Sequence, residues 1–202
     1  MMRNLNYSVW LFAAALLSPS AAVADPCRES LVREMSRPMK GQASKSTITT
    51  VTSGQKPMIN YHFSNGSGDW LTQVIDPPGM PWSLAVGDVL YASSDKGKTW
   101  KKVRELNDPG HDPEVVLKQQ ADVARSAQNI ACGFEEIDGV RLEKFEGDLV
   151  YPQMNMTTRQ TLWIHPATRQ TVKTFSVMRM SGMETAVTQS IEYLSDLTLP
   201  KP

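Results

Sequence analysis

The 202-residue sequence is short of the residue types from which most catalytic and nucleic-acid-binding sites are built. It has three histidines and two cysteines, and its 21 basic side chains are balanced by 21 acidic ones. A chain without net charge is neither a strongly basic nucleic-acid binder nor an acidic solvating tail. The sequence also lacks a glycine-rich phosphate loop and a basic patch interleaved with aromatic residues. We therefore expect no nucleotide or nucleic-acid partner.

Catalytic and metal-binding patterns are also missing. His62, His111 and His165 lie far apart and have none of the spacings of a zinc site. The cysteines form no Cys-x-x-Cys motif, and Gly66-Ser67-Gly68 lacks the Gly-x-Ser-x-Gly frame of a serine nucleophile. Neighbouring carboxylates such as Glu135-Glu136 are typical of a solvated strand edge or face. We therefore expect a protein that is not an enzyme and that carries no cofactor.

One apolar run stands near the start of the chain, at residues 9–17, and no second one follows. It is too short to span a bilayer, which takes about 20 apolar residues. Arg3 precedes the run and the small-x-small sequence Ala22-Val23-Ala24 follows it, as in a secretory signal peptide. We expect residues 1–24 to be a signal peptide that is cleaved after Ala24. Residues 25–202 then form one exported domain without stable membrane insertion.

The two cysteines, Cys27 and Cys132, both follow the predicted cleavage site. In an oxidising compartment two cysteines most simply pair with each other, so we expect a Cys27–Cys132 disulfide. The chain-entropy model assigns roughly 4–5 kcal/mol to a loop of this length. The alternative is a pair of buried free thiols.

Two segments are predicted to be helical. The first begins at Asp25-Pro26, an N-cap residue followed by a proline at the first helical position, and Pro38 ends it. Between them, apolar residues recur every four positions at Cys27, Leu31 and Met35. A second Asp-Pro pair, at Asp112-Pro113, predicts a helix over residues 112–128.

Most of the remaining chain has the composition of short strands joined by turns. Ile59, Tyr61 and Phe63 alternate along one segment, and Asp138-Gly139 is typical of a two-residue hairpin turn. Because helices do not alternate with the strands, the pattern favours an α+β antiparallel sheet or partly open barrel over a doubly wound fold. The predicted strands cover residues 44–52, 58–63, 89–93, 99–103, 130–137, 140–146, 148–153, 157–165, 171–180 and 184–194.

One hairpin carries a known sequence pattern. Residues 93–100 match the Asp-box, Ser-x-Asp-x-Gly-x-Thr-Trp. In sialidase-like propellers this motif recurs once per blade, whereas here it occurs once in a short chain. We therefore interpret it as a hairpin whose turn needs Asp95 and Gly97, with Trp100 packed below.

Several motifs of the second half resemble the LolA-like superfamily, which comprises periplasmic outer-membrane lipoprotein carriers and their relatives. In residues 162–173, Trp163-Ile164-His165 is similar to the family's Trp-Ile-Asp strand end, and Pro166-Ala167-Thr168 to its turn. Two positions depart from the pattern. His165 replaces the turn aspartate, and Arg169-Gln170 stands where glycine is common.

Further likenesses extend the resemblance over most of the predicted domain. Ile137-Asp138-Gly139-Val140 is similar to the family's central hairpin, and residues 193–200 to its closing strand. The early Asp-Pro-Cys helix and Cys132 resemble an uncharacterised, disulfide-bearing subgroup. The resemblance implies an antiparallel half-open β-barrel wrapped over two helices and enclosing an apolar cavity.

Methionines are grouped in the second half. Met154 and Met156, and likewise Met178 and Met180, are two residues apart, and Met183 is close by. On a strand this spacing puts both side chains of a pair on one face. Thioethers suit an adaptable apolar cavity, although ordinary core packing and Cu(I) binding also account for them. The predicted cavity-lining residues are Met154, Met156, Trp163, Phe175, Val177, Met178 and Met180, with a bulge near Val177 or Met178 to bring them together.

These observations favour a periplasmic binding or carrier protein that shields a hydrophobic ligand without covalent chemistry. The ligand would be an acyl chain or a lipidated segment, so lipid or lipidated cargo is the expected partner. One alternative is a structural or interaction module of the cell envelope, with an envelope protein as partner and no small ligand. The other is a copper-handling protein that uses the methionine pairs.

Overall fold

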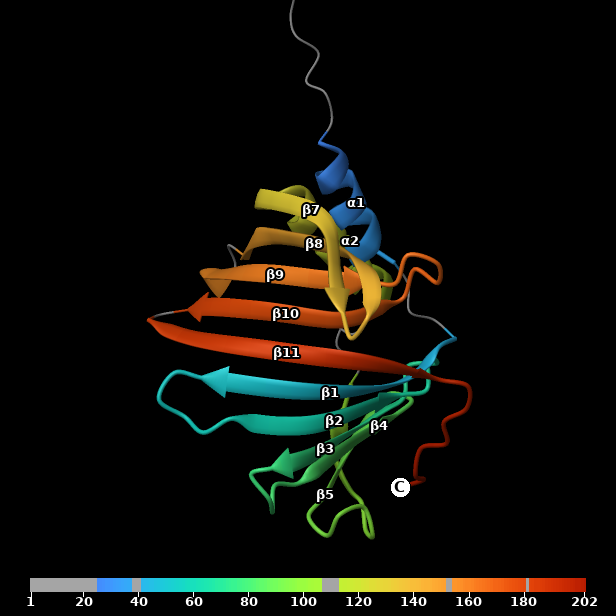
Figure 1. Ribbon diagram of the computed structural model, residues 1–202. Helices are drawn as coiled ribbons and strands as arrows, with labels where there is room; N and C mark the ends of the chain where they lie inside the picture. Colours follow the sequence, from blue (N-terminus) through green and yellow to red (C-terminus); the bar gives the residue numbers. More distant parts are fainter. Residues whose placement is uncertain (1–24, 38–40, 107–112, 152–153, 181) are drawn as a thin grey trace, which may run out of the picture.

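A computed structural model describes residues 25–37, 41–106, 113–151, 154–180 and 182–202 (Figure 1). The predicted signal peptide, Pro38, His111 and Asp112 lie outside the described residues. None of the described helices is long and apolar enough to cross a bilayer. The elements are α1 (Pro26–Met35), β1 (Ala43–Thr52), β2 (Met58–Ser64), β3 (Trp70–Asp76), β4 (Trp82–Val86), β5 (Val89–Ser93), β6 (Lys101–Glu105), α2 (Pro113–Arg125), β7 (Gln128–Ile137), β8 (Val140–Tyr151), β9 (Met156–Ile164), β10 (Thr171–Met180) and β11 (Met183–Leu194).

All the strands belong to one antiparallel sheet, in the order β6-β5-β4-β3-β2-β1-β11-β10-β9-β8-β7. The chain runs outward from the centre at β1 to one edge at β6, and α2 then leads to the other edge at β7. From there the strands return inward to β11, which pairs with β1 along its length. The edges β6 and β7 do not pair with each other. The sheet is therefore open, and the predicted half-open antiparallel barrel over two helices is confirmed.

Both helices cover the same end of this sheet, over β7, β8 and β9 (Figure 1). Leu31 of α1 is fully buried and belongs to a cluster with side chains from the sheet and from α2. Burying such an aliphatic side chain stabilises the fold by about 1.5–3 kcal/mol. The other buried members of the cluster are Ala124, Ala127, Phe145, Leu149, Leu162 and Ile164.

Helix α1 is held to the chain far from it in sequence. The predicted disulfide is confirmed, and it joins Cys27 of α1 to Cys132 of β7. One residue further along, Arg28 donates from Nη1 to the carbonyl oxygens of Arg125 and Ala127, at 2.7 and 2.6 Å. Arg125 is the last residue of α2 and Ala127 follows it, at the helix end where carbonyl acceptors lack a partner within the helix. Both helices are thus fixed to each other and to the edge of the sheet.

The helix ends follow local chemistry. Asp25 caps α1 as predicted, because its carboxylate accepts the N–H of Cys27 at 3.0 Å. The helix ends at Met35, and Ser36 is its C-cap. Helix α2 ends at Arg125, so the predicted extension to residue 128 is wrong. Gln128 instead begins β7.

Three strand predictions need correction. The separate strands at 140–146 and 148–153 are one strand, β8, which continues through Gly147. Gly147 permits close packing, since a Cβ there would lie 3.4 Å from both Leu31 and Ile130. The third is the strand predicted at 99–103, which starts at Lys101, because the residues before it complete the Asp-box turn. Strands β3 and β4 lie between the predicted strands at 58–63 and 89–93, where no strand was predicted.

The Asp-box forms the predicted hairpin between β5 and β6. The Asp95 carboxylate accepts hydrogen bonds from the Ser93 hydroxyl at 2.7 Å and from the Thr99 backbone and hydroxyl at 2.9 and 2.6 Å. Donation from Thr99, followed by Ser93, holds the pKa of Asp95 well below its usual range. Trp100 lies against Gly97, as does Trp82 of β4. The motif therefore has a structural role in this chain.

Candidate ligand-binding pocket

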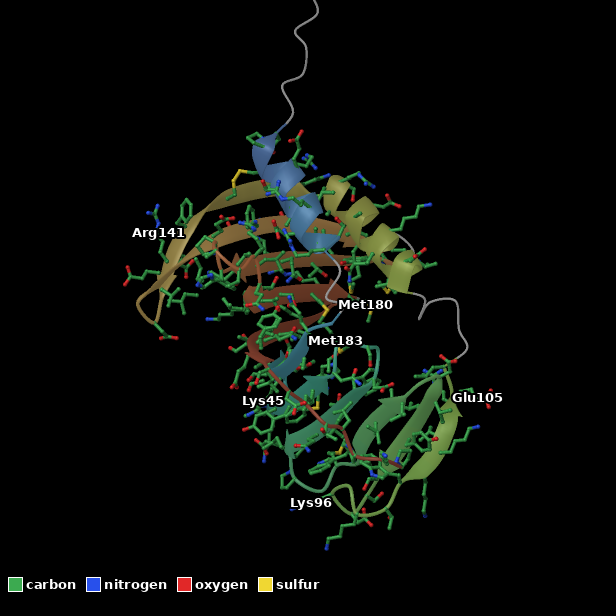
Figure 2. The ribbon with its side chains drawn as sticks, turned by 90° about the vertical axis from the view of Figure 1, so that its right-hand side faces the viewer. Lys45, Lys96, Glu105, Arg141, Met180 and Met183 are labelled. Atoms are coloured by element: carbon green, nitrogen blue, oxygen red, sulfur yellow. A yellow bond between two sulfur atoms is a disulfide. The ribbon has the colours of Figure 1, made fainter. Side chains whose placement is uncertain are left out.

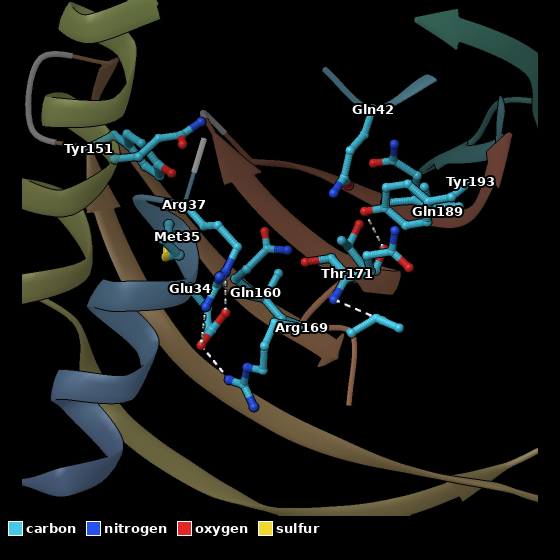
Figure 3. A pocket seen from close by; sticks show the side chains of 16 residues that line it. Glu34, Met35, Arg37, Gln42, Tyr151, Gln160, Arg169, Thr171, Gln189 and Tyr193 are labelled. Carbon is cyan, nitrogen blue, oxygen red and sulfur yellow. Dashed lines mark hydrogen bonds and ion pairs between the residues drawn. The ribbon is translucent and has the colours of Figure 1, made fainter. Parts of the chain in front are cut away.

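A pocket of about 530 Å³ lies between the C-terminal end of α1 and the helix-facing side of β9, β10 and β11 (Figure 3). Its volume falls within the range of about 300–1,000 Å³ that is typical of small-molecule sites. Its lining comes from both helices, four strands and two connections. The residues are Glu34, Met35, Arg37, Gln42, Gln120, Tyr151, Gln160, Leu162, Thr168, Arg169, Gln170, Thr171, Thr174, Gln189, Ile191 and Tyr193.

Strand pairing explains why these residues meet. Leu162 of β9 is opposite Thr174 of β10, and Thr174 is opposite Gln189 of β11. Directly opposite residues of antiparallel strands point to the same face, and so does every second residue along each strand. Gln160 and Ile191 therefore share this face with them. We call it the inner face, because α1 and α2 also lie on it.

Amide side chains give the pocket its polar character. Gln42, Gln120, Gln160, Gln170 and Gln189 reach it from five separate segments. The Gln189 amide donates to the Ser46 hydroxyl at 2.9 Å. The side-chain amides of Gln42, Gln120 and Gln170 have no partner among the described residues. Each of these amides offers both donors and an acceptor to a ligand.

Apolar surface is present beside the amides. Met35, Leu162 and Ile191 line the pocket together with the rings of Tyr151 and Tyr193. Tyr193 donates its hydroxyl to the Thr171 carbonyl at 3.2 Å. Burial raises the pKa of both tyrosines, although for Tyr193 the hydrogen bond to Thr171 opposes part of this rise. Both phenols are therefore neutral near pH 7, and the pocket is amphipathic.

An ion-pair cluster closes one side of the pocket. The Glu34 carboxylate, whose side chain is 1% exposed, binds Arg37 Nε at 3.0 Å, Arg33 Nε at 3.2 Å and the Arg169 guanidinium. Burial alone would raise the pKa of Glu34, but the hydrogen bonds from Arg37, Arg169 and Arg33 outweigh it and lower the pKa. Glu34 is therefore ionised, and the three arginines balance its negative charge.

The β9–β10 turn accounts for both departures from the family pattern. His165 does what a turn aspartate would do, because its Nδ1 accepts the N–H of Thr168 at 3.3 Å. Arg169 has φ 59°, the left-handed conformation that glycine adopts most easily. Its guanidinium binds Glu34 and also donates to Glu143 at 2.6 Å. The arginine thus joins the turn to α1 and β8, which glycine would not do.

The seven predicted cavity residues fall into two groups. Lys173 pairs with Trp163, and Phe175 and Val177 are on the same face as Lys173 because they follow it at every second position. This register places Trp163, Phe175 and Val177 on the outer face, opposite the helices. Trp163 is 7% exposed and lies between the ammonium groups of Lys144 and Lys173, at 5.9 and 5.2 Å from the ring centre. The predicted bulge near Val177 or Met178 is wrong, since β10 pairs with β9 without a shift from Lys173 to Arg179.

Three of the four predicted methionines share the inner face with the pocket. Met178 and Met180 alternate with Val177 and therefore face inward, and Met156 faces inward with Gln160. Met154 precedes β9, so it does not share a strand with Met156 as predicted. None of the seven predicted residues, all of them described, is among those that line the pocket. A role of Met154, Met156, Met178 and Met180 in ligand binding stays a prediction.

Sequence reasoning did not find Glu34, Arg37 and the glutamines. One signal was available in Arg169, a charged residue at a turn position that usually holds glycine. The glutamines carry no local pattern, since they come together through pairing of distant segments. Among the described residues, no group of three histidine, cysteine or carboxylate side chains is arranged to hold a metal ion.

Comparison with known proteins gives a likeness in fold. No family model and no curated protein matches the chain. Among solved structures, LprF from Mycobacterium bovis matches at TM-score 0.52 and 17% identity, over 88% of this chain and 98% of LprF. The chain has a LolA-like fold. At this identity the LolA-like fold is what is shared, and the ligand is a separate question.

Two other structures are similar at lower scores. The LolA superfamily protein NE2245 from Nitrosomonas europaea matches at TM-score 0.37 and 12% identity, over 85% of this chain and 94% of that one. A DUF1329 family protein from Desulfovibrio piger ATCC 29098 matches at TM-score 0.36 and 11% identity, over 85% of this chain and 93% of that one.

Proposed function

We propose that the protein is an exported, periplasmic binding or carrier protein that holds an amphiphile in the pocket beneath α1. The ligand is an acyl chain or a lipidated segment, and its binding involves no covalent step. The observation that carries the proposal is a pocket of about 530 Å³ in which Met35, Leu162 and Ile191 lie beside side-chain amides that have no partner among the described residues. Apolar groups that fix a chain, together with a few polar groups that orient it, are typical of such sites.

The apolar side of the pocket supplies the affinity. Each methylene that leaves water contributes about 0.8 kcal/mol, so four to eight of them contribute about 3–6 kcal/mol before ordering costs. The inner face continues beyond the pocket at Met178, Met180 and Met156. In this proposal these side chains contact the part of the acyl chain that extends out of the pocket. Trp163, Phe175 and Val177 have no part in it, because they lie on the outer face.

The polar side of the pocket orients the ligand. Glu34 and the arginines around it already satisfy one another, so they provide little free charge for an ionic head group. Gln42, Gln120 and Gln170 remain for a group that both donates and accepts hydrogen bonds. In this arrangement the acyl chain of the ligand lies against the apolar side of the pocket, and its polar end contacts the amide side chains.

Two features support export. Residues 1–24 have the pattern of a cleavable signal peptide. The Cys27–Cys132 disulfide fits an oxidising compartment, since cytosolic proteins rarely keep disulfides. Edman sequencing of the protein recovered from the periplasm of an expressing bacterium would test this assignment, and we expect it to start at Asp25.

Displacement of a fluorescent fatty acid by unlabelled acyl chains tests the binding proposal. We expect saturable binding by the disulfide-bonded protein and at least tenfold weaker binding by Ile191→Gln, which puts an amide on the apolar wall. Ile75→Gln is the matched control, because Ile75 is exposed on β3. It should bind as the unmodified protein does. Absence of saturable binding by the folded protein would overturn the proposal and leave the interaction module as the better hypothesis.

A further inference from the structure

We propose that Met156, Met180 and Met183 form a binding site for a soft monovalent cation, Cu(I), at one end of the neighbouring strands β9, β10 and β11. The inference goes beyond ligand binding in the pocket. It rests on the strand register and on the chemistry of the thioether.

The register brings the three methionines into one row. Met180 and Met183 are directly opposite each other across the β10–β11 pair. The last pair of β9 and β10 is Thr157 with Arg179, so the next positions, Met156 and Met180, lie side by side. Opposite residues of antiparallel strands have Cβ atoms about 4.5–5.5 Å apart. The flexible methionine side chains can therefore bring three sulfur atoms to one ion.

All three side chains belong to the inner face. Each is an even number of residues along its strand from a residue that lines the pocket: Met156 from Gln160, Met180 from Thr174 and Met183 from Gln189. Figure 2 shows Met180 and Met183 next to each other on the side of the sheet where the helices lie. Met180 is 44% exposed and Met183 is 51% exposed. Exposed methionines grouped in this way are open to a ligand from solution.

The chemistry of the row selects for a soft ion. Thioether sulfur is neutral and polarisable, and it favours Cu(I) over Zn²⁺ or Mg²⁺. Arg179 and Glu184 lie on the other face, where they pair with each other at 2.8 Å. No free cysteine competes for the ion, because Cys27 and Cys132 are joined. Thioethers do not titrate, so binding should not change between pH 5 and pH 8.

Titration with Cu(I) in ascorbate against the chromophoric chelator bicinchoninate tests the site, with Ag(I) as a probe that needs no reductant. We expect one ion per protein, and at least tenfold weaker binding by Met180→Leu and by Met183→Leu. Met80→Leu is the matched control, since Met80 is 49% exposed in the β3–β4 connection, and it should bind as the unmodified protein does. Absence of binding by the unmodified protein, or equal loss in all three variants, would overturn the proposal.

The same variants separate this site from the amphiphile pocket. Leucine is apolar and close to methionine in volume, so Met183→Leu keeps the surface that an acyl chain would contact and removes only the sulfur. We expect fatty-acid displacement to be unchanged in Met183→Leu while Cu(I) binding is lost. If instead fatty-acid binding is lost and Cu(I) binding is retained, the three methionines bind the acyl chain and the metal site is refuted. Far-ultraviolet circular dichroism of each variant verifies that the sheet is intact.

Discussion

The guanidinium of Arg169 binds the buried carboxylate of Glu34 although the two residues are 135 positions apart in the sequence. Its second nitrogen donates to Glu143 at 2.6 Å. One side chain therefore connects the β9–β10 turn to α1 and to β8, on the wall of the pocket. The connection requires Arg169 to keep φ 59°, a conformation that is unfavourable for any residue with a Cβ.

Replacement of Arg169 separates the ion pairs from the backbone conformation. Arg169→Ala keeps the left-handed Cβ and removes both ion pairs, whereas Arg169→Gly removes the ion pairs and relaxes the backbone. We expect Arg169→Gly to lower the free energy of unfolding by about 1.5–3 kcal/mol, the range for hydrogen bonds to charged groups. Arg169→Ala should cost about 1 kcal/mol more. Urea denaturation measures both, and a glycine variant as stable as the unmodified protein would contradict the prediction.

The Glu34 cluster makes stability depend on acid pH. The net effect of burial and the arginine hydrogen bonds is to lower the pKa of Glu34 from its ordinary value of 4.5. A carboxyl whose pKa is lower in the folded state stabilises the fold fully above its unfolded pKa, and this contribution disappears as pH falls through the folded pKa. We expect Glu34→Gln to be less stable at pH 7 and to lose less stability below about pH 4.5.

Urea denaturation from pH 7 to pH 3 checks this difference, with Glu192→Gln as the control on the exposed side of β11. The stabilities of the unmodified protein and Glu34→Gln should converge in acid, while Glu192→Gln follows the unmodified protein throughout. Parallel curves for Glu34→Gln and the unmodified protein would contradict the prediction.

The disulfide is predicted to stabilise the placement of α1 over β7. Its sequence separation is 105 residues. Disulfides typically stabilise a fold by about 2–4 kcal/mol, which is less than the chain-entropy model assigns to a loop of this length. Replacement of both Cys27 and Cys132 by alanine should lower the free energy of unfolding by this amount. Dithiothreitol should destabilise the unmodified protein and leave the double variant unaffected. Equal stability of the two proteins in oxidising buffer would show that the bond contributes nothing.

Local signals predicted much of the fold. The N-cap at Asp25 and the strands at 89–93 and 171–180 have the predicted ends, because turn residues and alternation mark them in the sequence itself. The predicted break at Gly147 is absent, because the glycine continues β8 and leaves room for Leu31 and Ile130, which lie 3.4 Å from the position of a Cβ. Strand structure on both sides of Gly147 was predictable from local composition, whereas the continuity of β8 depends on tertiary packing.

The candidate site was harder to predict. Alternation shows that Phe175 and Val177 share a face but does not say which face the helices cover. The face that Phe175 and Val177 occupy follows from the pairing of Lys173 with Trp163 and from the position of α1. The ion-pair cluster and the glutamines come from segments that meet only in the folded chain. The residue pattern of a single strand therefore does not predict the ion-pair cluster or the grouping of the glutamines.

The last prediction concerns Gly97 in the Asp-box hairpin. Gly97 has φ 84°, and a Cβ at this position would lie 3.3 Å from the Trp82 ring and 3.4 Å from the Trp100 ring. Gly97→Ala should therefore incur the left-handed penalty of about 1–2 kcal/mol and also displace an indole. Gly79→Ala is the matched control, because Gly79 has φ 87° and nothing within 4 Å of the added Cβ. We expect both variants to be destabilised in urea, Gly97→Ala the more so, and only Gly97→Ala to change tryptophan fluorescence. Equal destabilisation with unchanged fluorescence would mean that the indoles do not pack on the turn as described.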